Sequence, residues 1–199
     1  MASLVVCCVG LVGSGKSTVA REFSKLLDAV FISGDDIRVE LRKKGESFAT
    51  VREIALTAAL EAVKAGKNAV LDSDFSDFKK REEFTRKFEE VGVRVLFVHV
   101  TCDLDVAIGR VIATEYPDGA DNFFAGASSL WRGSSQSRGA VVRIREMMRR
   151  IPHHYDWSGE MGGMWKPKLL PGPFFAEIDT THDGWNDRVK ECASQLLRT

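Results

Sequence analysis

An excess of charge of one sign is missing from this sequence. Its 199 residues include 28 Lys and Arg and 28 Asp and Glu, which gives a formal net charge of zero. A chain that bound nucleic acid over its whole surface would be more basic. Any contact with a polyanion must therefore come from a local basic patch.

Paired cysteine motifs are also missing. The four cysteines, Cys7, Cys8, Cys102 and Cys192, form no C-x-x-C pair, which argues against a zinc site. Cys7 and Cys102 lie in apolar, strand-like runs and are interpreted as core residues. Because this usage does not look like a disulfide framework, we expect a reducing, cytoplasmic location.

The sequence has no long hydrophobic run. The longest apolar run near the N-terminus, residues 4–13, is too short to span a bilayer, and Lys16 follows it closely. No basic segment precedes it, so it lacks the layout of a signal peptide. We therefore expect neither a targeting segment nor a membrane anchor.

Short β-rich runs alternate with helical patterns along most of the chain. Strands are predicted at residues 4–9, 29–33, 68–71, 94–100 and 174–178. Helices are predicted at residues 15–27, 50–67, 77–91, 103–113 and 185–197, with a short helix after Asp36. This alternation predicts one α/β domain over residues 1–199, with a parallel sheet covered on both faces. The helix at 77–91 is expected to face solvent because it is highly charged.

Two stretches break this pattern and carry no strong periodicity. Residues 115–139 are rich in Gly and Ser, and residues 152–173 also look irregular. Loops of this length in a compact domain tend to be functional or mobile. The first is our candidate for a lid segment.

A phosphate-binding motif follows the first predicted strand. Residues 10–17 read G-L-V-G-S-G-K-S and fit the pattern G-x-x-x-x-G-K-[ST] without a mismatch. Its glycines allow backbone N–H groups to converge on phosphate oxygens, and the helix that follows adds its positive end. Lys16 should reach the β- and γ-phosphates, and the hydroxyl of Ser17 should ligate Mg²⁺. The residues expected to bind ATP-Mg²⁺ here are Gly10, Leu11, Val12, Gly13, Ser14, Gly15, Lys16, Ser17 and Thr18.

A second polar element, residues 33–38 (S-G-D-D-I-R), follows the second predicted strand. Ligands of open α/β sheets bind outside the carboxyl ends of the strands, so this element should face the same cleft as the phosphate motif. A carboxylate there could accept the proton of an attacking hydroxyl, and Arg38 could hold a phosphate. The alternative is that Asp35 or Asp36 caps the helix that carries Arg38.

The phosphate motif followed by D-D-x-R resembles the P-loop kinases related to the 5′-hydroxyl polynucleotide kinases. Further similarity lies in residues 69–74 (A-V-L-D-S-D), in Arg81 of the next helix, and in residues 98–110, a strand and a helix ending in Arg110. The resemblance covers roughly residues 3–112. The D-G-D-N-x-R element of adenylylsulfate kinases is also similar to residues 33–38.

This resemblance implies a fold and a set of roles. The fold would be a three-layer α/β/α P-loop NTPase of the nucleoside-monophosphate-kinase-like type, with a five-stranded parallel sheet in the order 2-3-1-4-5. Asp35 would be the general base on the acceptor hydroxyl, and Arg38 would grip an acceptor phosphate. Asp72 would lie beside the metal and the phosphates, and Arg110 would contact the nucleotide.

The sequence departs from the family after Arg110. The family usually has a second arginine soon afterwards that closes over the phosphates, and residues 111–119 contain no basic residue. A phosphoryl-transfer lid needs a cation. Arg132 and Arg138 in the lid segment are the substitutes, and Arg143 on the next predicted helix is the fallback.

These observations predict an ATP-dependent kinase that transfers the γ-phosphate to a hydroxyl acceptor. The favoured acceptor is the 5′-hydroxyl of a polynucleotide, as the family resemblance implies. Residues 131–168, which combine eight Lys or Arg with three Asp or Glu and interspersed aromatics, would suit a single-stranded nucleic acid or a nucleotide base. A charged helix face is the alternative reading of that cluster. There are two alternative functions. One is a small-molecule kinase acting on a nucleotide, adenylylsulfate or sugar-like acceptor, and the other is a regulatory P-loop NTPase.

Overall fold

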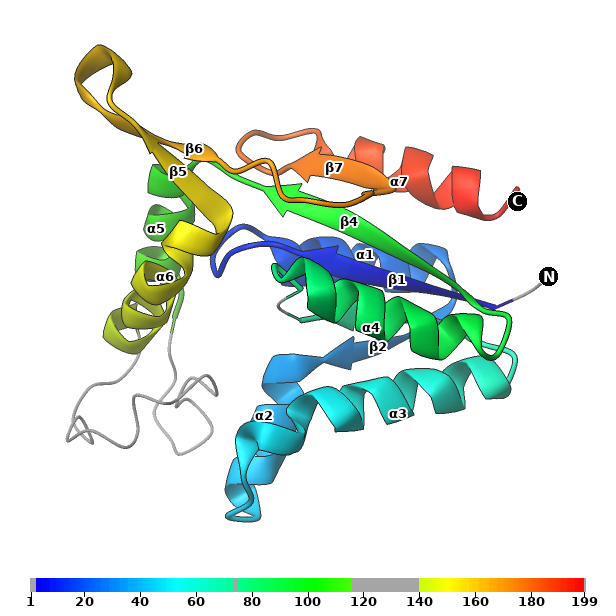
Figure 1. The fold of residues 1–199 in the computed structure, drawn as a ribbon. Coiled ribbons are helices and arrows are strands. Elements are labelled where there is room, and N and C mark those ends of the chain that lie inside the picture. Colours follow the sequence, from blue (N-terminus) through cyan, green and yellow to red (C-terminus); the bar gives the residue numbers. More distant parts are fainter. Residues whose placement is uncertain (1–2, 74, 116–139, 199) are drawn as a thin grey trace.

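The structure, a computed structural model, describes residues 3–73, 75–115 and 140–198. Five parallel strands form the main sheet in the order β2-β3-β1-β4-β7 (Figure 1). Their bounds are β1 (Leu4–Val9), β2 (Ala29–Ser33), β3 (Asn68–Asp72), β4 (Arg94–Thr101) and β7 (Ala176–Asp179). The predicted strands and their order are confirmed, with β7 as the fifth strand.

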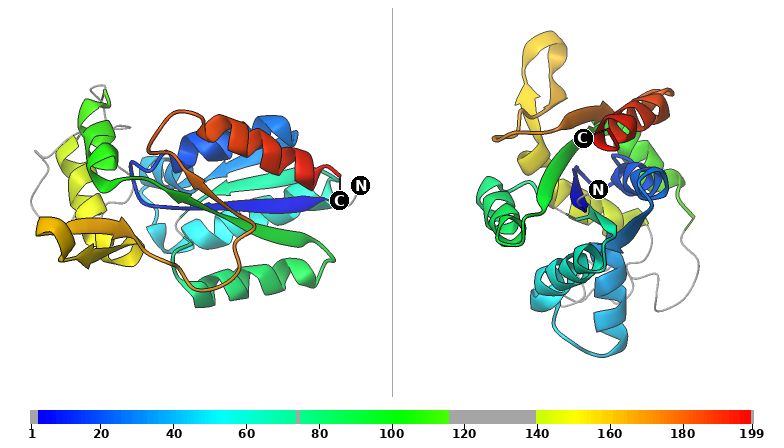
Figure 2. Two further views of the ribbon diagram at one scale, coloured as in Figure 1. Left: turned by 90° about the horizontal axis from the view of Figure 1, so that it is seen from above. Right: turned by 90° about the vertical axis from the view of Figure 1, so that its right-hand side faces the viewer.

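Helices cover both faces of the sheet, as the alternation predicted (Figure 2). α1 (Lys16–Leu26) and α7 (Trp185–Leu196) pack on one face, and α3 (Val51–Lys64) and α4 (Phe78–Glu89) pack on the other. Successive residues of β1 enter opposite cores, since Val6 and Cys8 pack with α1 and α7 while Val5, Cys7 and Val9 pack with α3 and α4. No helix in the described ranges is both long and apolar enough to cross a membrane.

Three further helices lie near the carboxyl ends of the strands, opposite the chain termini (Figure 1). They are α2 (Gly34–Lys43), α5 (Leu104–Ala113) and α6 (Ala140–His154), and short 3₁₀ turns occur at Phe48–Thr50 and Glu160–Gly162. A third apolar cluster joins α5 to α6 through residues that include Leu11, Ala107 and Met147. This cluster fixes α6 against the loop that follows β1.

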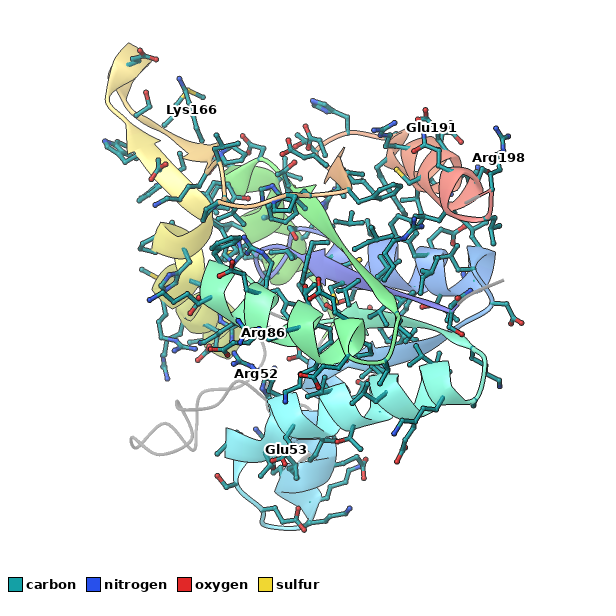
Figure 3. The ribbon with its side chains drawn as sticks, turned by 45° about the vertical axis from the view of Figure 1, so that its right-hand side comes forward. Arg52, Glu53, Arg86, Lys166, Glu191 and Arg198 are labelled. Carbon is teal, nitrogen blue, oxygen red and sulfur yellow. The ribbon has the colours of Figure 1, made fainter. Side chains whose placement is uncertain are left out.

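The prediction of an irregular stretch at 152–173 is wrong over residues 152–167, while residues 168–173 form no helix or strand. Pro152 lies inside α6, and β5 (Tyr155–Ser158) and β6 (Met164–Pro167) form an antiparallel hairpin. Trp157 and Trp165 face each other across it with ring centroids 5.3 Å apart, and Lys166 lies on its projecting arm (Figure 3). Strands of four residues held by a cross-strand aromatic pair leave little periodicity to detect.

Nearly all of the predicted lid segment, with Arg132 and Arg138, lies outside the described residues. Residues 116–139 belong to this part of the chain. The roles predicted for both arginines therefore stay predictions.

The prediction that the charged helix at 77–91 faces solvent is wrong for one side of α4. Arg81 is only 2% exposed, and Phe84 and Phe88 are buried with it. The Arg81 guanidinium donates to the backbone carbonyl oxygens of Phe75, Ser76 and Pro171. Arg81 thus ties the segment after β3 to the segment before β7.

We expect Arg81→Ala to lower the free energy of unfolding by about 3 kcal/mol, because it leaves three carbonyl oxygens without their donor. Arg86→Ala is the matched control, since Arg86 is exposed on the same helix (Figure 3) and should change stability by less than about 0.5 kcal/mol. Urea denaturation measures both. Equal, small effects would show that Arg81 contributes no more than a surface arginine.

Candidate active site

The loop between β1 and α1 has the backbone geometry of an anion cradle. Gly13 and Gly15 adopt φ of 84° and 79°, which side chains with a Cβ rarely adopt. A Cβ on Gly13 would lie 2.5 Å from the Ala107 carbonyl oxygen, and one on Gly10 would lie 2.5 Å from that of Val100. The glycines of the motif are therefore required by close packing as well as by backbone conformation.

The N-terminus of α1 opens directly from this cradle. Its N-cap is Gly15, and no side chain makes a capping hydrogen bond there in the described part of the chain. First-turn N–H groups without a capping side chain, together with the positive end of the helix, favour a bound anion. Residues 10–18 therefore fit the phosphates of a nucleotide.

A cavity of about 570 Å³ lies over the cradle. Its wall combines the cradle with residues from α2, α5, α6 and the segment after β7. The lining residues are Leu11, Val12, Gly13, Gly15, Lys16, Ser17, Thr18, Asp35, Arg110, Thr114, Arg143, Thr180 and Trp185. We call this space the nucleotide cavity.

Lys16 and Asp72 form an ion pair at the base of this region. Asp72 is the last residue of β3, is 6% exposed, and lies beside Cys8 of β1 in the sheet register. A buried carboxylate is retained only with a partner, and Lys16 supplies the charge here. The Ser17 hydroxyl is exposed on the cavity wall, so Ser17 and Asp72 offer the oxygen ligands that Mg²⁺ prefers.

The first turn of α2 brings Asp35 to the nucleotide cavity. The alternative that Asp35 or Asp36 caps the helix is wrong, because α2 begins at Gly34 and the Ser33 hydroxyl accepts from the Asp36 N–H at 3.1 Å. Asp35 instead pairs with Arg38 Nη1 at 2.8 Å and with Arg143 Nη1 at 3.3 Å. Its carboxylate is thus held between α2 and α6, on the cavity wall.

Arg110 of α5 lines the nucleotide cavity. Its guanidinium donates to the Thr180 hydroxyl at 3.0 Å and to the Thr180 carbonyl oxygen. Thr180 follows β7, and its hydroxyl donates to the Ser14 carbonyl oxygen at 2.6 Å. Arg110 and Thr180 therefore brace the cradle from the far edge of the sheet.

Sequence reasoning missed three contributors to the cavity wall: Thr114, Thr180 and Trp185. Thr180 could have been found from its place after the fifth strand, since strand ends meet at one edge of a parallel sheet. Arg143 was only the fallback cation, yet it reaches both the cavity wall and Asp35. The structure brings together Lys16, Asp35, Arg38, Asp72, Arg110 and Arg143.

Solved structures with the same fold include several kinases. The chain aligns with the adenylylsulfate (APS) kinase of Mycobacterium tuberculosis at a TM-score of 0.56 and 18% identity, covering 99% of this chain and 96% of that one. A sugar kinase from Janibacter gives 0.54 and 14%, covering 98% and 95%, and the shikimate kinase of Acinetobacter baumannii gives 0.51 and 15%, covering 98% and 94%. At these identities the likeness shows the fold alone.

Sequence comparison gives a family. No curated protein sequence matches this chain significantly. The family model described as an AAA domain matches residues 5–130, which is more than half of the 199 residues. The match contains the cradle, Asp35, Asp72 and Arg110. The chain therefore belongs to the AAA domain family and has a P-loop kinase-like fold.

Proposed function

We propose that this protein is a phosphotransferase that moves the γ-phosphate of Mg²⁺-ATP to a hydroxyl group of an acceptor. The observation that carries the proposal is the presence of Asp35 on the wall of the cavity that the phosphate cradle also lines. A carboxylate there can take the proton of an attacking hydroxyl, and Arg38, 2.8 Å from it, adds a cation that can hold an anionic acceptor. The kinase-like fold of the neighbours named above also supports this class.

Each side chain has a place in the proposed reaction. The acceptor oxygen attacks the γ-phosphorus, the bond to the β,γ-bridging oxygen breaks, and ADP leaves. Asp35 takes the hydroxyl proton as the bond forms. Lys16 and Arg143 offset the negative charge on the transferring group, while Ser17 and Asp72 would hold a Mg²⁺ ion, which would add further positive charge there.

Two acceptor classes fit this proposal. The 5′-hydroxyl of a polynucleotide follows from the family resemblance and from the basic residues of α6. A small molecule is supported by the adenylylsulfate, sugar and shikimate kinases that share the fold. Arg38, which pairs with Asp35 at 2.8 Å, suits either class because its guanidinium can hold an anionic group of the acceptor.

Radiolabelled transfer from [γ-³²P]ATP tests the proposal. The acceptor panel contains 5′-hydroxyl DNA and RNA oligonucleotides, nucleotides, adenylylsulfate and sugars. Label appearing on one class identifies the acceptor. Rapid ATP hydrolysis that no acceptor stimulates or captures would replace the kinase with a regulatory NTPase.

Arg143→Ala should lower kcat for transfer by about 10²-fold, because it removes a donor positioned for the charge of the transition state. Arg145→Ala is the matched control, since Arg145 is exposed on the same helix. Steady-state kinetics at saturating ATP separates the two variants. If Arg143→Ala keeps a normal kcat, the catalytic cation must come from elsewhere, with Arg132 and Arg138 as the remaining sequence candidates.

A further inference from the structure

A second polar cavity, of about 360 Å³, lies between α4 and α6. Its lining residues come from the segment after β3, the first turn of α4 and the last turns of α6. They are Ser76, Asp77, Lys80, Arg149, Arg150 and His153. We call this space the basic cavity, and none of the roles given above uses it.

Positive charge exceeds negative charge on the wall of the basic cavity. The wall has one carboxylate, that of Asp77, and three cationic side chains, those of Lys80, Arg149 and Arg150. This leaves an excess of two positive charges. Asp77 is already engaged, since it caps α4 and pairs with Lys80 Nζ at 3.6 Å. His153 adds ring nitrogens that can hydrogen-bond to an oxyanion.

Glu146 lies behind the two arginines and fixes their position. Its carboxylate is 2% exposed and pairs with Arg149 at 2.7 Å and with Arg150 at 3.6 Å. Counting Glu146 still leaves the cluster one positive charge in excess, three cations against two carboxylates. A guanidinium whose position is fixed by a carboxylate loses little side-chain entropy when it binds an anion, and the Arg149 side chain is 59% exposed.

The basic cavity and the nucleotide cavity lie along the same helix. Arg143 lines the nucleotide cavity and Arg150 lines the basic cavity. Seven residues of α-helix correspond to about 10 Å along the axis. The start of α2 also abuts the segment that leads to Ser76, since a Cβ on Gly34 would lie 3.2 Å from Ser73 Oγ.

We infer that the basic cavity binds a phosphate group of the acceptor, so that the acceptor is a small phosphate ester long enough to place its reacting hydroxyl in the nucleotide cavity and its phosphate in the basic cavity. The inference rests on the proposed kinase function and names the class of its acceptor. The hydroxyl lies at Asp35 and the phosphate lies among Lys80, Arg150 and His153. An acceptor of this length spans both cavities beside α6.

Phosphate binding tests this inference without any transfer step. The full chain is first saturated with Mg²⁺ and a non-hydrolysable ATP analogue, which fills the cradle, and is then titrated with inorganic phosphate by calorimetry. We expect Lys80→Gln and Arg150→Gln each to weaken phosphate binding by about tenfold or more, because each removes one charge-assisted contact. Lys79→Gln and Arg145→Gln, exposed on the same two helices, should bind phosphate as the unchanged chain does.

The outcomes separate this site from the kinase proposal. No phosphate binding beyond the filled cradle, or equal binding by Lys80→Gln and Lys79→Gln, would overturn the inference. Arg150→Gln could disturb the pair with Glu146, so the decision rests on Lys80→Gln, whose side chain is 47% exposed and not needed for packing. A chain that binds phosphate in the basic cavity but transfers no label would keep the phosphate site and refute the kinase function, and with it the acceptor class.

The acceptor assay adds a second arm. Hydroxyl compounds with and without a distal phosphate are compared at saturating ATP, beside a 5′-hydroxyl oligonucleotide. The distal phosphate should lower KM for the unchanged chain by about tenfold or more, and Lys80→Gln should remove that advantage. An oligonucleotide preferred over every small phosphate ester would overturn the stated acceptor class.

Discussion

Replacing Lys16 with alanine is expected to lower phosphoryl transfer by about 10³-fold or more, within the range observed when a cation on the transferring phosphate is lost. Lys16 opens α1 from the cradle and lines the nucleotide cavity. With nucleotide bound, we expect its ammonium to pair with the β- and γ-phosphates instead of Asp72. Transfer is measured with labelled ATP at saturating nucleotide.

The matched control is Lys25→Ala, on the same helix, where the lysine is exposed and pairs with Glu22 at 3.6 Å. Its transfer rate should stay within about twofold, since surface ion pairs contribute little. The far-ultraviolet circular dichroism of both variants should match that of the unchanged chain. Full activity of Lys16→Ala at saturating ATP would show that the cradle is not part of the catalytic site.

Lys16→Ala also removes the partner of a buried carboxylate. Asp72 is 6% exposed, and breaking one side of such a pair is destabilising because the remaining charge stays buried. The Tm of ligand-free Lys16→Ala should therefore fall, and adding Asp72→Asn should recover part of the loss. This double-mutant comparison separates the structural role of the pair from its role in transfer.

Replacing Asp35 with asparagine is expected to lower kcat by about 10²–10⁴-fold, the usual effect of removing a general base. The amide keeps the size of the side chain but cannot take the hydroxyl proton. Nucleotide affinity should change little, because we expect Lys16, Ser17 and the cradle backbone to bind the nucleotide phosphates. Steady-state kinetics and a fluorescent nucleotide titration give the two quantities separately.

Asp36→Asn is the control for Asp35→Asn. The two residues are adjacent, but Asp36 is exposed and Asp35 lies on the cavity wall. Asp36→Asn should keep nearly full activity. If Asp35→Asn loses ATP affinity and keeps its turnover, then Asp35 belongs to the nucleotide site and another group must take the proton.

Local patterns were enough to predict the frame of the molecule. β1 is apolar on both faces, because alternate residues enter two different cores, and such a run predicts a central parallel strand. The motif at residues 10–17 predicts its own conformation, since its glycines are needed for positive φ and close approach. These features depend on neighbours in sequence, so the sequence displays them directly.

Features that depend on packing could not be predicted in this way. In the sequence, Arg81 is one of many charged residues on a helix that is expected to be exposed. In the structure it contacts the Pro171 carbonyl oxygen and the Phe174 ring, about 90 residues away, and the sequence around Arg81 does not indicate these contacts. The β5–β6 hairpin has too few residues per strand for a periodic signal. The cap of α2 is local, but Ser33 and the two aspartates all suit that role, and only the helix start at Gly34 decides between them.

The sequence by itself determined the parallel α/β frame, the phosphate cradle and the position of a carboxylate after the second strand, because each is encoded by a short pattern of residue types. Tertiary structure alone decided which polar groups meet: Lys16 with Asp72, Arg143 with Asp35, and the Thr180 hydroxyl with the Ser14 carbonyl oxygen. These partners are 56, 108 and 166 residues apart. They meet because the sheet brings its carboxyl ends to one edge and the apolar contacts of Met147 fix α6 across that edge, an arrangement that no local pattern specifies.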